Sequence, residues 1–479
     1  MLTYTFEKSG GVSLYEQLYR HIKSDILSGV LAAGEKLPSK RALAAHLEVS
    51  VITVKNAYEQ LIAEGYICGV EKRGYYVMRI DQPLTAAPSA MTETIDEPPE
   101  RQWFMDFVTN STAAEYFPFA TWTKLLRQTI LEQDTHLLRP TPSTGALELR
   151  QAIADYLHQF RGMTVSPRQI IVGAGTETLY TLLIQLLGRE KCYAVEDPGY
   201  SKIGRIYQSN QVQLRHVALD ESGLSCQALR QTDADVVHIS PSHHYPTGIV
   251  MPVARRHELL RWADEEEGRY ILEDDYDSEF RFVGRPIPTL FSDDEHQHVI
   301  YLNTFSKTIA PSIRISYMLL PPRLLEDYRE KLGFYSCTVS SFEQYTLAEF
   351  LSRGHYEQHL NRMRKRYHQK RDAVIDCILS GPLAGRAEIM EQDAGLHFLV
   401  RLDTALPDET LRQRAAERGL RLALLSDYYR HGEDALPPRR GCAPPRAGGE
   451  LFRHRIGKIT PGAGASGGNH QGVIVCTTN

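Results

Sequence analysis

The sequence predicts a multidomain protein, with a small α+β head at the N-terminus followed by a large α/β domain with a mainly parallel sheet. Its 479 residues are enough for two or more domains. Up to about residue 80, helical patterns lead into two short strand-like segments. From about residue 103 to 427, helical stretches alternate with β-branched runs, which is typical of parallel strands joined by crossover helices. These runs are QIIVGAG, CYAVED, ADVVHIS, RYILEDD and HVIYLNT.

The composition is that of an ordinary globular protein, with 42% hydrophobic and 24% charged residues. No segment approaches the roughly 18 uninterrupted apolar residues of a membrane span. The first residues contain no apolar signal core, so we expect a cytoplasmic protein that does not contact membranes. Seven scattered cysteines without a CxxC pair argue against a disulfide framework or a zinc site. Because the net charge is −5, any DNA contact has to come from a local basic surface.

The first 80 residues contain the pattern of a helix-turn-helix followed by a β-wing. Residues 13–29 place leucine and isoleucine on one helical face. A second helix opens at Ser39, and a third opens at Ser50 after a tight turn. The strand-like segments YICGV and YYVMRI flank a basic turn at residues 71–74. On this pattern alone, a small protein-interaction module remains an alternative.

The elements LPSKR, VSVITV, AYEQLIAEGY and RGYYV follow one another between residues 37 and 77, and they resemble the winged-helix head of the GntR superfamily of regulators. In such heads, basic side chains and helix N-termini meet phosphates, and the recognition helix reaches base edges. By this resemblance, the DNA contacts are Ser39, Arg41, Ser50, Thr53, Lys55, Asn56, Arg73 and Gly74. Val51 and Ile52 lie where relatives often carry polar or basic residues, so the resemblance gives no operator sequence.

Two segments of the large domain place reactive residues at strand ends. TFSKTIAPSIR has Lys307 just after a strand, next to Ser306, with Arg314 seven residues further on. A semi-buried lysine near other cations has a lowered pKa and becomes a nucleophilic neutral amine. Arginine suits a phosphate dianion. YILEDDYDSEF ends a buried strand with Asp274 and Tyr276.

Two further segments predict an anion site and an aromatic wall. IVGAGTETL passes from strand to helix at Gly175 and Thr176, where backbone N–H groups bind anions, and EDPGYSK places Tyr200 at another strand end. A lysine, an acid, a phosphate cradle and a stacked ring are what pyridoxal phosphate requires of a protein. Two alternatives stay open for the acids of residues 273–277, namely a surface turn and a metal site.

Together with FPFATW and GALELRQAIADYLHQFRG, these motifs resemble the fold-type-I aminotransferases. With the head attached, the chain is similar to the MocR/GabR subfamily of GntR-type transcription regulators from Met1 to about Asp427. The resemblance implies a fold-type-I α/β domain with a smaller C-terminal α+β subdomain, and pyridoxal 5'-phosphate as cofactor. By the resemblance, Lys307 forms the Schiff base, Asp274 contacts the ring nitrogen of the cofactor and Tyr276 contacts its ring hydroxyl. Tyr200 stacks on the ring, and the phosphate is bound by Arg314, Gly175 and Thr176, with Ser306 in the same site.

Three positions depart from the pattern of this subfamily. Glu177 stands where a glutamine is usual beside the phosphate loop, and its charge is unfavourable there unless it points away. His244 replaces a common glutamine, and Lys202 lies where some relatives place an effector-binding arginine. We therefore transfer no particular ligand from the family.

The predicted domains are a winged helix-turn-helix over residues 1–80, a linker over 81–102, the aminotransferase-like domain over 103–440 and an atypical tail over 441–479. The tail holds nine glycines in 39 residues and has no helical or strand period before the short run VIVCT. The arginine that clamps the effector carboxylate in relatives has no match there. Our hypothesis is a frame-shifted or divergent C-terminus, and a disordered tail is the alternative.

Three functions follow from these motifs. The first is a regulator that senses an amino acid or amine through external aldimine formation at Lys307, and the resemblance implies that it is a homodimer on repeated operator half-sites. The second is an active aminotransferase with an accessory DNA-binding head, so whether the chain is an enzyme stays open. The third is a DNA-binding module with a cofactor-free domain, which the surviving cofactor motifs disfavour. The sequence does not tell which effector is bound or whether transcription is activated or repressed.

Overall fold

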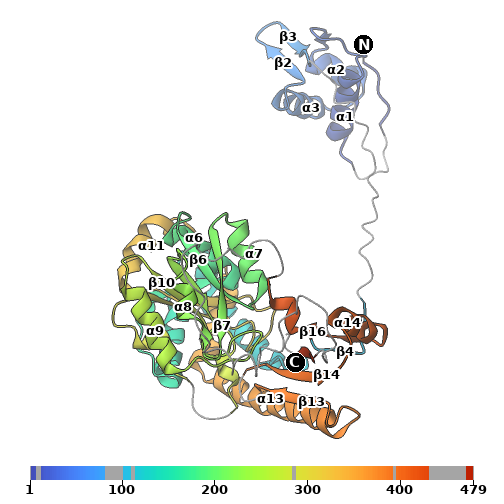
Figure 1. The fold of residues 1–479 in the computed structure, drawn as a ribbon. Coiled ribbons are helices and arrows are strands. Elements are labelled where there is room, and N and C mark those ends of the chain that lie inside the picture. The colour runs from blue at the N-terminus through green and yellow to red at the C-terminus, as the bar shows by residue number, and fades with distance from the viewer. Residues whose placement is uncertain are drawn as a thin grey trace. The chain divides into compact units, whose positions relative to one another are not determined.

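A computed structural model of the chain describes residues 2–6, 12–80, 101–108, 114–282, 287–391, 395–430 and 471–477. The chain divides into two compact units, Met1–Glu100 and Arg101–Asn479 (Figure 1). Each unit is considered by itself. Most of the predicted linker, residues 81–100, lies outside the described residues. In the described part, no helix has both the length and the apolar character needed to cross a membrane.

The first unit is a winged helix-turn-helix, as the sequence predicted. Its helices are α1 (Leu14–Leu27), α2 (Lys40–His46) and α3 (Val51–Ala63), and its three-stranded antiparallel sheet has the order β1 (Lys36–Leu37), β3 (Gly74–Val77), β2 (Ile67–Val70). Apolar side chains of the three helices and the sheet form one core, which includes Leu18, Leu43 and Leu61. The hydroxyl of Ser39 accepts from the Ala42 N–H at 3.2 Å. Ser50 likewise accepts from the Thr53 N–H at 3.0 Å. Helices α2 and α3 therefore both begin at serine N-caps.

The second unit contains an eight-stranded, mainly parallel sheet, which confirms the predicted α/β fold. The order is β5 (Ile170–Gly173), β12 (Ser316–Leu319), β11 (Val299–Thr304), β10 (Tyr270–Asp274), β9 (Val236–Ile239), β6 (Cys192–Asp197), β7 (Gln213–Asp220), β8 (Gly223–Leu224). The five strands from β11 to β7 run parallel to one another. Strand β12 is antiparallel to both neighbours, and β8 is antiparallel to β7.

Helices cover both faces of this sheet. They are α4 (Phe119–Leu137), α5 (Leu147–Tyr156), α6 (Thr176–Leu187), α7 (Ser201–Ser209), α8 (Cys226–Leu229), α9 (Val253–Asp264), α10 (Leu290–Asp293), α11 (Leu325–Leu332), α12 (Ser341–Ser352) and α13 (His355–Ser380). Along β10, Leu272 joins the core under α6 and α11, whereas Ile271 joins the core under α9. Since successive strand residues point to opposite faces, apolar runs such as VIYLNT are buried throughout.

A smaller α+β subdomain follows α13. Its antiparallel sheet has the order β13 (Ala387–Met390), β14 (His397–Asp403), β17 (Gln471–Thr477), β16 (Ala423–Leu424), with α14 (Asp408–Glu417) beside it. A separate pair joins β15 (Leu420–Arg421) to β4 (Met105–Asp106). The short helical turns of the unit are η1 (Ala114–Tyr116), η2 (Leu157–Arg161), η3 (Pro167–Gln169), η4 (Ser278–Phe280), η5 (Pro322–Leu324) and η6 (Leu425–Tyr428).

Strand β17 corrects the expectation of a disordered tail for its own seven residues. It lies between β14 and β16 and pairs with all of residues 397–403. Its side chains from Val473 to Cys476 are buried, so this apolar run contributes to the subdomain core. The rest of the predicted tail up to residue 470 lies outside the described residues. The frame-shift hypothesis stays a prediction.

Candidate functional site

A cavity of about 710 Å³ lies at the carboxyl ends of the parallel strands of the second unit. Ligands of open α/β sheets bind at this edge. Strand β10 ends at the cavity with Asp274, and helices α6 and α7 begin there. The small subdomain supplies residues 427–430 to the wall. Of the residues that the sequence assigned to the cofactor, those that line this cavity are Thr176, Tyr200, Asp274, Tyr276, Ser306, Lys307 and Arg314.

Lys307 follows β11 in a turn that hydrogen bonds hold in place. The hydroxyl of Ser306 donates to the Ile313 carbonyl at 2.9 Å, and the Ser306 N–H donates to Thr304 Oγ1 at 3.1 Å. Burial is the main cause that lowers the pKa of the Lys307 amine, and Arg314 lowers it further. The lowered pKa increases the share of the neutral amine, which is the nucleophilic form.

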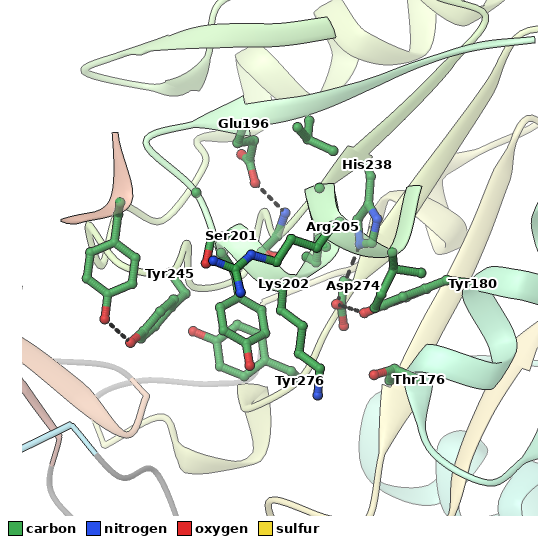
Figure 2. A pocket seen from close by; sticks show the side chains of 18 of the residues that line it. Thr176, Tyr180, Glu196, Ser201, Lys202, Arg205, His238, Tyr245, Asp274 and Tyr276 are labelled. Carbon is green, nitrogen blue, oxygen red and sulfur yellow. Dashed lines mark hydrogen bonds and ion pairs between the residues drawn. The ribbon is translucent and has the colours of Figure 1, made fainter. Parts of the chain in front are cut away.

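Asp274 offers one carboxylate oxygen to a ligand. Its Oδ2 atom accepts a hydrogen bond from the Tyr180 hydroxyl at 2.5 Å and lies 3.5 Å from His238 Nε2 (Figure 2). Its Oδ1 atom is buried and has no hydrogen-bond partner among the described residues. A buried acceptor left without a donor costs about 1–3 kcal/mol. The site therefore fits a ligand that places an N–H group at this position, such as a ring with a protonated pyridine nitrogen.

The predicted phosphate cradle contains an anion of the protein itself. Glu177, in the first turn of α6, accepts from Lys202 Nζ, and its Oε1 atom lies 3.3 Å from Arg314 Nη2. The hydrogen bond from Lys202 is the main cause that lowers the pKa of Glu177. The Glu177 carboxylate thus faces the two cations of the cradle and does not point away from them.

Gly175 lies beside this cradle as the N-cap of α6, with φ at +89°. A Cβ atom at Gly175 would come within 2.3 Å of Arg314 Nη2. Only glycine combines the left-handed backbone with this close approach of the guanidinium. The two predicted phosphate residues, far apart in sequence, are therefore neighbours in the fold.

Tyr200 and Tyr276 differ in how far their side chains are buried in the cavity wall. Tyr200 is 49% exposed and packs edge-on against Tyr245, with ring centroids 5.7 Å apart. Tyr276 is part-buried, and its hydroxyl lies 3.4 Å from His243 Nδ1. Burial raises the pKa of Tyr276 well above its usual value, so the phenol keeps its proton.

The sequence analysis missed several residues of the cavity wall. Tyr180 lies one helical turn after Thr176, and an i, i+4 reading of α6 would have found it. His238 reaches the site because β9 pairs with β10, which a single sequence does not reveal. Arg205 comes from α7 and is an exposed side chain that lines the cavity. Lys202, which the sequence singled out as a departure from the subfamily, is a second exposed side chain of α7 in this wall (Figure 2).

Two further wall residues are buried and uncharged at neutral pH. Burial raises the pKa of Glu196 to about 8 and lowers that of His244 to about 3. Glu196 Oε2 accepts from the Ser240 N–H at 3.0 Å and lies 3.5 Å from His244 Nε2. Of the two buried acids of this wall, Asp274 is the one with a carboxylate oxygen that has no hydrogen-bond partner among the described residues.

The acids of residues 273–277 do not converge on one point, which contradicts the metal alternative for this run. Glu273 accepts from two backbone N–H groups, those of Leu290 and Phe291. Asp275 pairs with Arg161 at 2.5 Å. Asp277 pairs with His243, and Asp274 alone of the four acids lines the cavity.

The predicted DNA contacts lie on the surface of the first unit, where α2, α3 and the wing meet solvent. Arg41, Lys55, Asn56 and Arg73 are exposed side chains. Ser39 and Ser50 act as N-caps, and Thr53 hydrogen-bonds to Ser50 at 2.8 Å. Gly74 follows the turn of the wing with φ at +114°. The contacts themselves stay predictions.

Comparisons with known proteins agree with this architecture. The family described as aminotransferase class I and II matches residues 108–425, and the gntR family of bacterial regulatory proteins matches residues 14–77. The HTH-type transcriptional regulator YdeL of Bacillus subtilis is 38% identical over 424 residues, which cover 88% of this chain and 90% of that protein. The probable rhizopine catabolism regulatory protein MocR of Rhizobium meliloti is 31% identical over 452 residues, covering 91% and 90%.

Solved aminotransferases share the fold of the second unit. A kynurenine aminotransferase of Pyrococcus horikoshii superposes with a TM-score of 0.60 at 23% identity, covering 68% of this chain and 82% of that one. At this identity the likeness concerns the fold alone.

Proposed function

The chain belongs to the MocR-type transcription regulators, which join a GntR-family DNA-binding head to an aminotransferase-like domain, and we propose that it senses a primary amine or amino acid through pyridoxal 5'-phosphate. One observation carries this proposal. A lysine amine with a lowered pKa and a buried carboxylate oxygen, which receives no hydrogen bond from the part of the chain that the structure describes, belong to residues that line the same cavity. A DNA-binding regulator of this kind works in the cytoplasm.

The surroundings of several predicted cofactor residues support the roles proposed for them. Asp274 would hold the proton of the ring nitrogen with its Oδ1 atom, while Tyr180 orients the carboxylate through Oδ2. Arg314 and Thr176 would bind the phosphate at the start of α6, next to Gly175.

Bound pyridoxal phosphate supplies an aldehyde carbon that links reversibly to a primary amine. Lys307 provides such an amine. Burial, the main cause of its lowered pKa, keeps part of this amine neutral and able to exchange with the amine of a ligand. Lys202 and Arg205 add cations to the same cavity, which supports an acidic group on the ligand. An amino acid combines both features.

A ligand changes DNA affinity only if it binds two states of the protein with different affinity. The wall of the cavity offers a physical basis for two states, because residues 427–430 belong to the small subdomain. Tyr428 donates to or accepts from the Tyr245 hydroxyl at 2.6 Å, and the Gly199 N–H donates to the Tyr428 carbonyl at 3.1 Å. A ligand in the cavity thus meets the large domain and the subdomain at once.

The proposal includes a homodimer on repeated half-sites, which suits a GntR-type head. It is tested by loading the full-length protein with pyridoxal phosphate and screening amino acids and amines for a shift of its visible absorbance. We expect a yellow protein and at least one ligand that shifts the spectrum. A protein that stays colourless after loading would refute the cofactor.

An active aminotransferase is the second candidate function. Lys307 favours it, because a neutral amine in this position also serves as a general base for a proton shift. Multiple turnovers with an amino donor and a keto acid, without any effect of the donor on DNA binding, would favour the enzyme over the regulator.

Removing one phosphate-binding cation from the head is expected to weaken the salt dependence of DNA binding. For Arg41→Ala and Lys55→Ala, the slope of log affinity against log salt is predicted to fall by about one unit each. The matched control is Arg20→Ala, an exposed cation of α1 that pairs with Glu16. Fluorescence anisotropy with a DNA selected by the protein from a random pool measures the slope. Equal slopes for all three variants would show that Arg41 and Lys55 do not contact phosphates.

Neutralising Glu177 is expected to tighten cofactor binding. Its carboxylate competes with a phosphate for Lys202 and Arg314, and exposed ion pairs of this kind are worth about 0.2–1 kcal/mol. Glu177→Gln should therefore lower the dissociation constant of pyridoxal phosphate by a factor of about 1.4 to 5. Glu265→Gln is the matched control, since Glu265 also pairs with two arginines, but outside the cavity. Equal or weaker binding by Glu177→Gln in equilibrium dialysis would contradict the competition.

A further inference from the structure

A hydrogen-bonded chain leads from the small subdomain to the phenol of Tyr276. The Leu396 N–H, next to the start of β14, donates to Asp277 Oδ2 at 3.1 Å. The same oxygen lies 2.9 Å from His243 Nδ1, and this nitrogen lies 3.4 Å from the Tyr276 hydroxyl. His243 and Asp277 are 2% and 1% exposed, so water does not compete for these bonds.

The geometry decides which atom of the chain donates. If His243 Nδ1 carried a lone pair, that lone pair would face the carboxylate of Asp277 at 2.9 Å, which is repulsive. Nδ1 therefore carries the hydrogen and donates it to Asp277. Because Nδ1 carries its hydrogen, the Tyr276 oxygen, 3.4 Å away, acts as an acceptor in its contact with His243. A phenol oxygen that accepts from His243 leaves its own proton free to donate elsewhere, and Tyr276 lines the cavity.

The subdomain holds this pair closely. Gly395 has φ at +71°, and a Cβ atom there would lie 1.9 Å from His243 Nδ1 and 2.6 Å from Asp277 Oδ2. His397, the first residue of β14, packs on His243 with ring centroids 4.3 Å apart. Any shift of β14 relative to the large domain therefore disturbs the Asp277–His243 pair.

We propose that the Asp277–His243 pair is a positioning unit that directs the phenol proton of Tyr276 towards the ring hydroxyl of the cofactor and ties this direction to the position of β14. The inference rests on the proposed function, because it needs the cofactor in the cavity. It gives the regulator a physical link between ligand chemistry and the small subdomain. In this role His243 and Asp277 act through Tyr276 and touch no ligand themselves.

The measurement is the pH midpoint of the visible absorbance of the bound cofactor in the full-length protein. Donation by Tyr276 stabilises the more negative, deprotonated form of the chromophore, so losing it favours the protonated form. His243→Leu is predicted to raise the midpoint by about one pH unit, the effect of one hydrogen bond to a charged group. In His243→Asn, the side-chain amide can replace the Nδ1–H donor, so the midpoint should return most of the way to the wild-type value. Other ionisable groups around the pair are the same in all variants, namely Asp274, Glu196, Tyr245, His244, His397 and Lys307.

Two further comparisons separate positioning from a general loss of structure. In a Tyr276→Phe background, His243→Leu should change the midpoint no further, because its effect passes through the phenol. Gly395→Ala should raise the midpoint in the same direction, whereas Gly385→Ala should not. The two glycines share a left-handed backbone, with φ at +71° and +76°, but a Cβ atom at Gly385 meets nothing within 4 Å.

Three outcomes would overturn the inference. An unchanged midpoint in His243→Leu would show that the pair does not direct the proton of Tyr276. An equal shift of the midpoint by His243→Leu in the Tyr276→Phe background would show that its effect does not pass through the phenol. A wild-type protein without visible absorbance would refute the proposed cofactor, and the inference with it. If Gly395→Ala does not fold, the His243 variants still decide the role of the pair.

Discussion

Lys307→Ala is expected to abolish covalent attachment of pyridoxal phosphate completely. Lys307 is the lysine that the fold brings to the carboxyl end of β11 with a lowered pKa, in the same cavity as Asp274. Without its amine, the aldehyde has no protein partner, and a ligand amine has nothing to displace. After borohydride reduction, the intact wild-type protein should gain the mass of one reduced cofactor, and the variant should gain none.

The matched control for this prediction is Lys331→Ala. Lys331 is a half-exposed lysine of α11 outside the cavity, so its loss should leave the mass gain unchanged. Attachment that persists in Lys307→Ala, at Lys202 for example, would show that the cofactor uses a different amine. Peptide mapping of the reduced protein identifies the lysine directly.

Arg314→Ala is expected to weaken cofactor binding by roughly 30-fold, because losing a hydrogen bond to a charged group costs about 2 kcal/mol. The guanidinium approaches the start of α6 at Gly175, where the helix N-terminus also favours an anion. Equilibrium dialysis of the cofactor-free protein gives the dissociation constant. Since Glu177 is a partner of Arg314, the same variant also frees this carboxylate next to the phosphate.

Arg329→Ala serves as the control for Arg314→Ala. Arg329 is 75% exposed and pairs with Glu326 on α11, away from the cavity. Its loss should leave cofactor affinity unchanged. A dissociation constant for Arg314→Ala within a factor of about two of the wild type would mean that the phosphate does not lie at Arg314.

The residues that the sequence could assign are those whose chemistry depends on their place at a strand end. Lys307 follows and Asp274 ends an apolar, β-branched run of the kind typical of buried strands, and the edge of a parallel sheet brings such ends together. The head was equally readable, since Ser39 and Ser50 cap helices whose apolar positions recur every three or four residues.

Other features depend on contacts that a single sequence does not contain. The antiparallel direction of β12 follows from its pairing with β11 and β5, not from its residues. His238 reaches Asp274 through strand register, and His243 meets Asp277 through the packing of two segments. Glu177 was recognised as unusual, but only its contacts with Lys202 and Arg314 revealed what its charge does.

The sequence showed the short run VIVCT but did not predict its position in a sheet. Strand β17 lies at the centre of the subdomain sheet, because β14 and β16 leave a gap that an apolar strand fills. The glycine-rich composition before it masked this contribution, since composition averages over residues that behave differently.

The central claim is that ligand chemistry at Lys307 controls DNA binding. It is tested most directly by adding one amine or amino acid to the loaded full-length protein while following cofactor absorbance and DNA anisotropy in the same sample. The account predicts that both signals change with the same midpoint in ligand concentration, and that Lys307→Ala loses both responses. A ligand that shifts the absorbance fully while DNA affinity stays constant would contradict it.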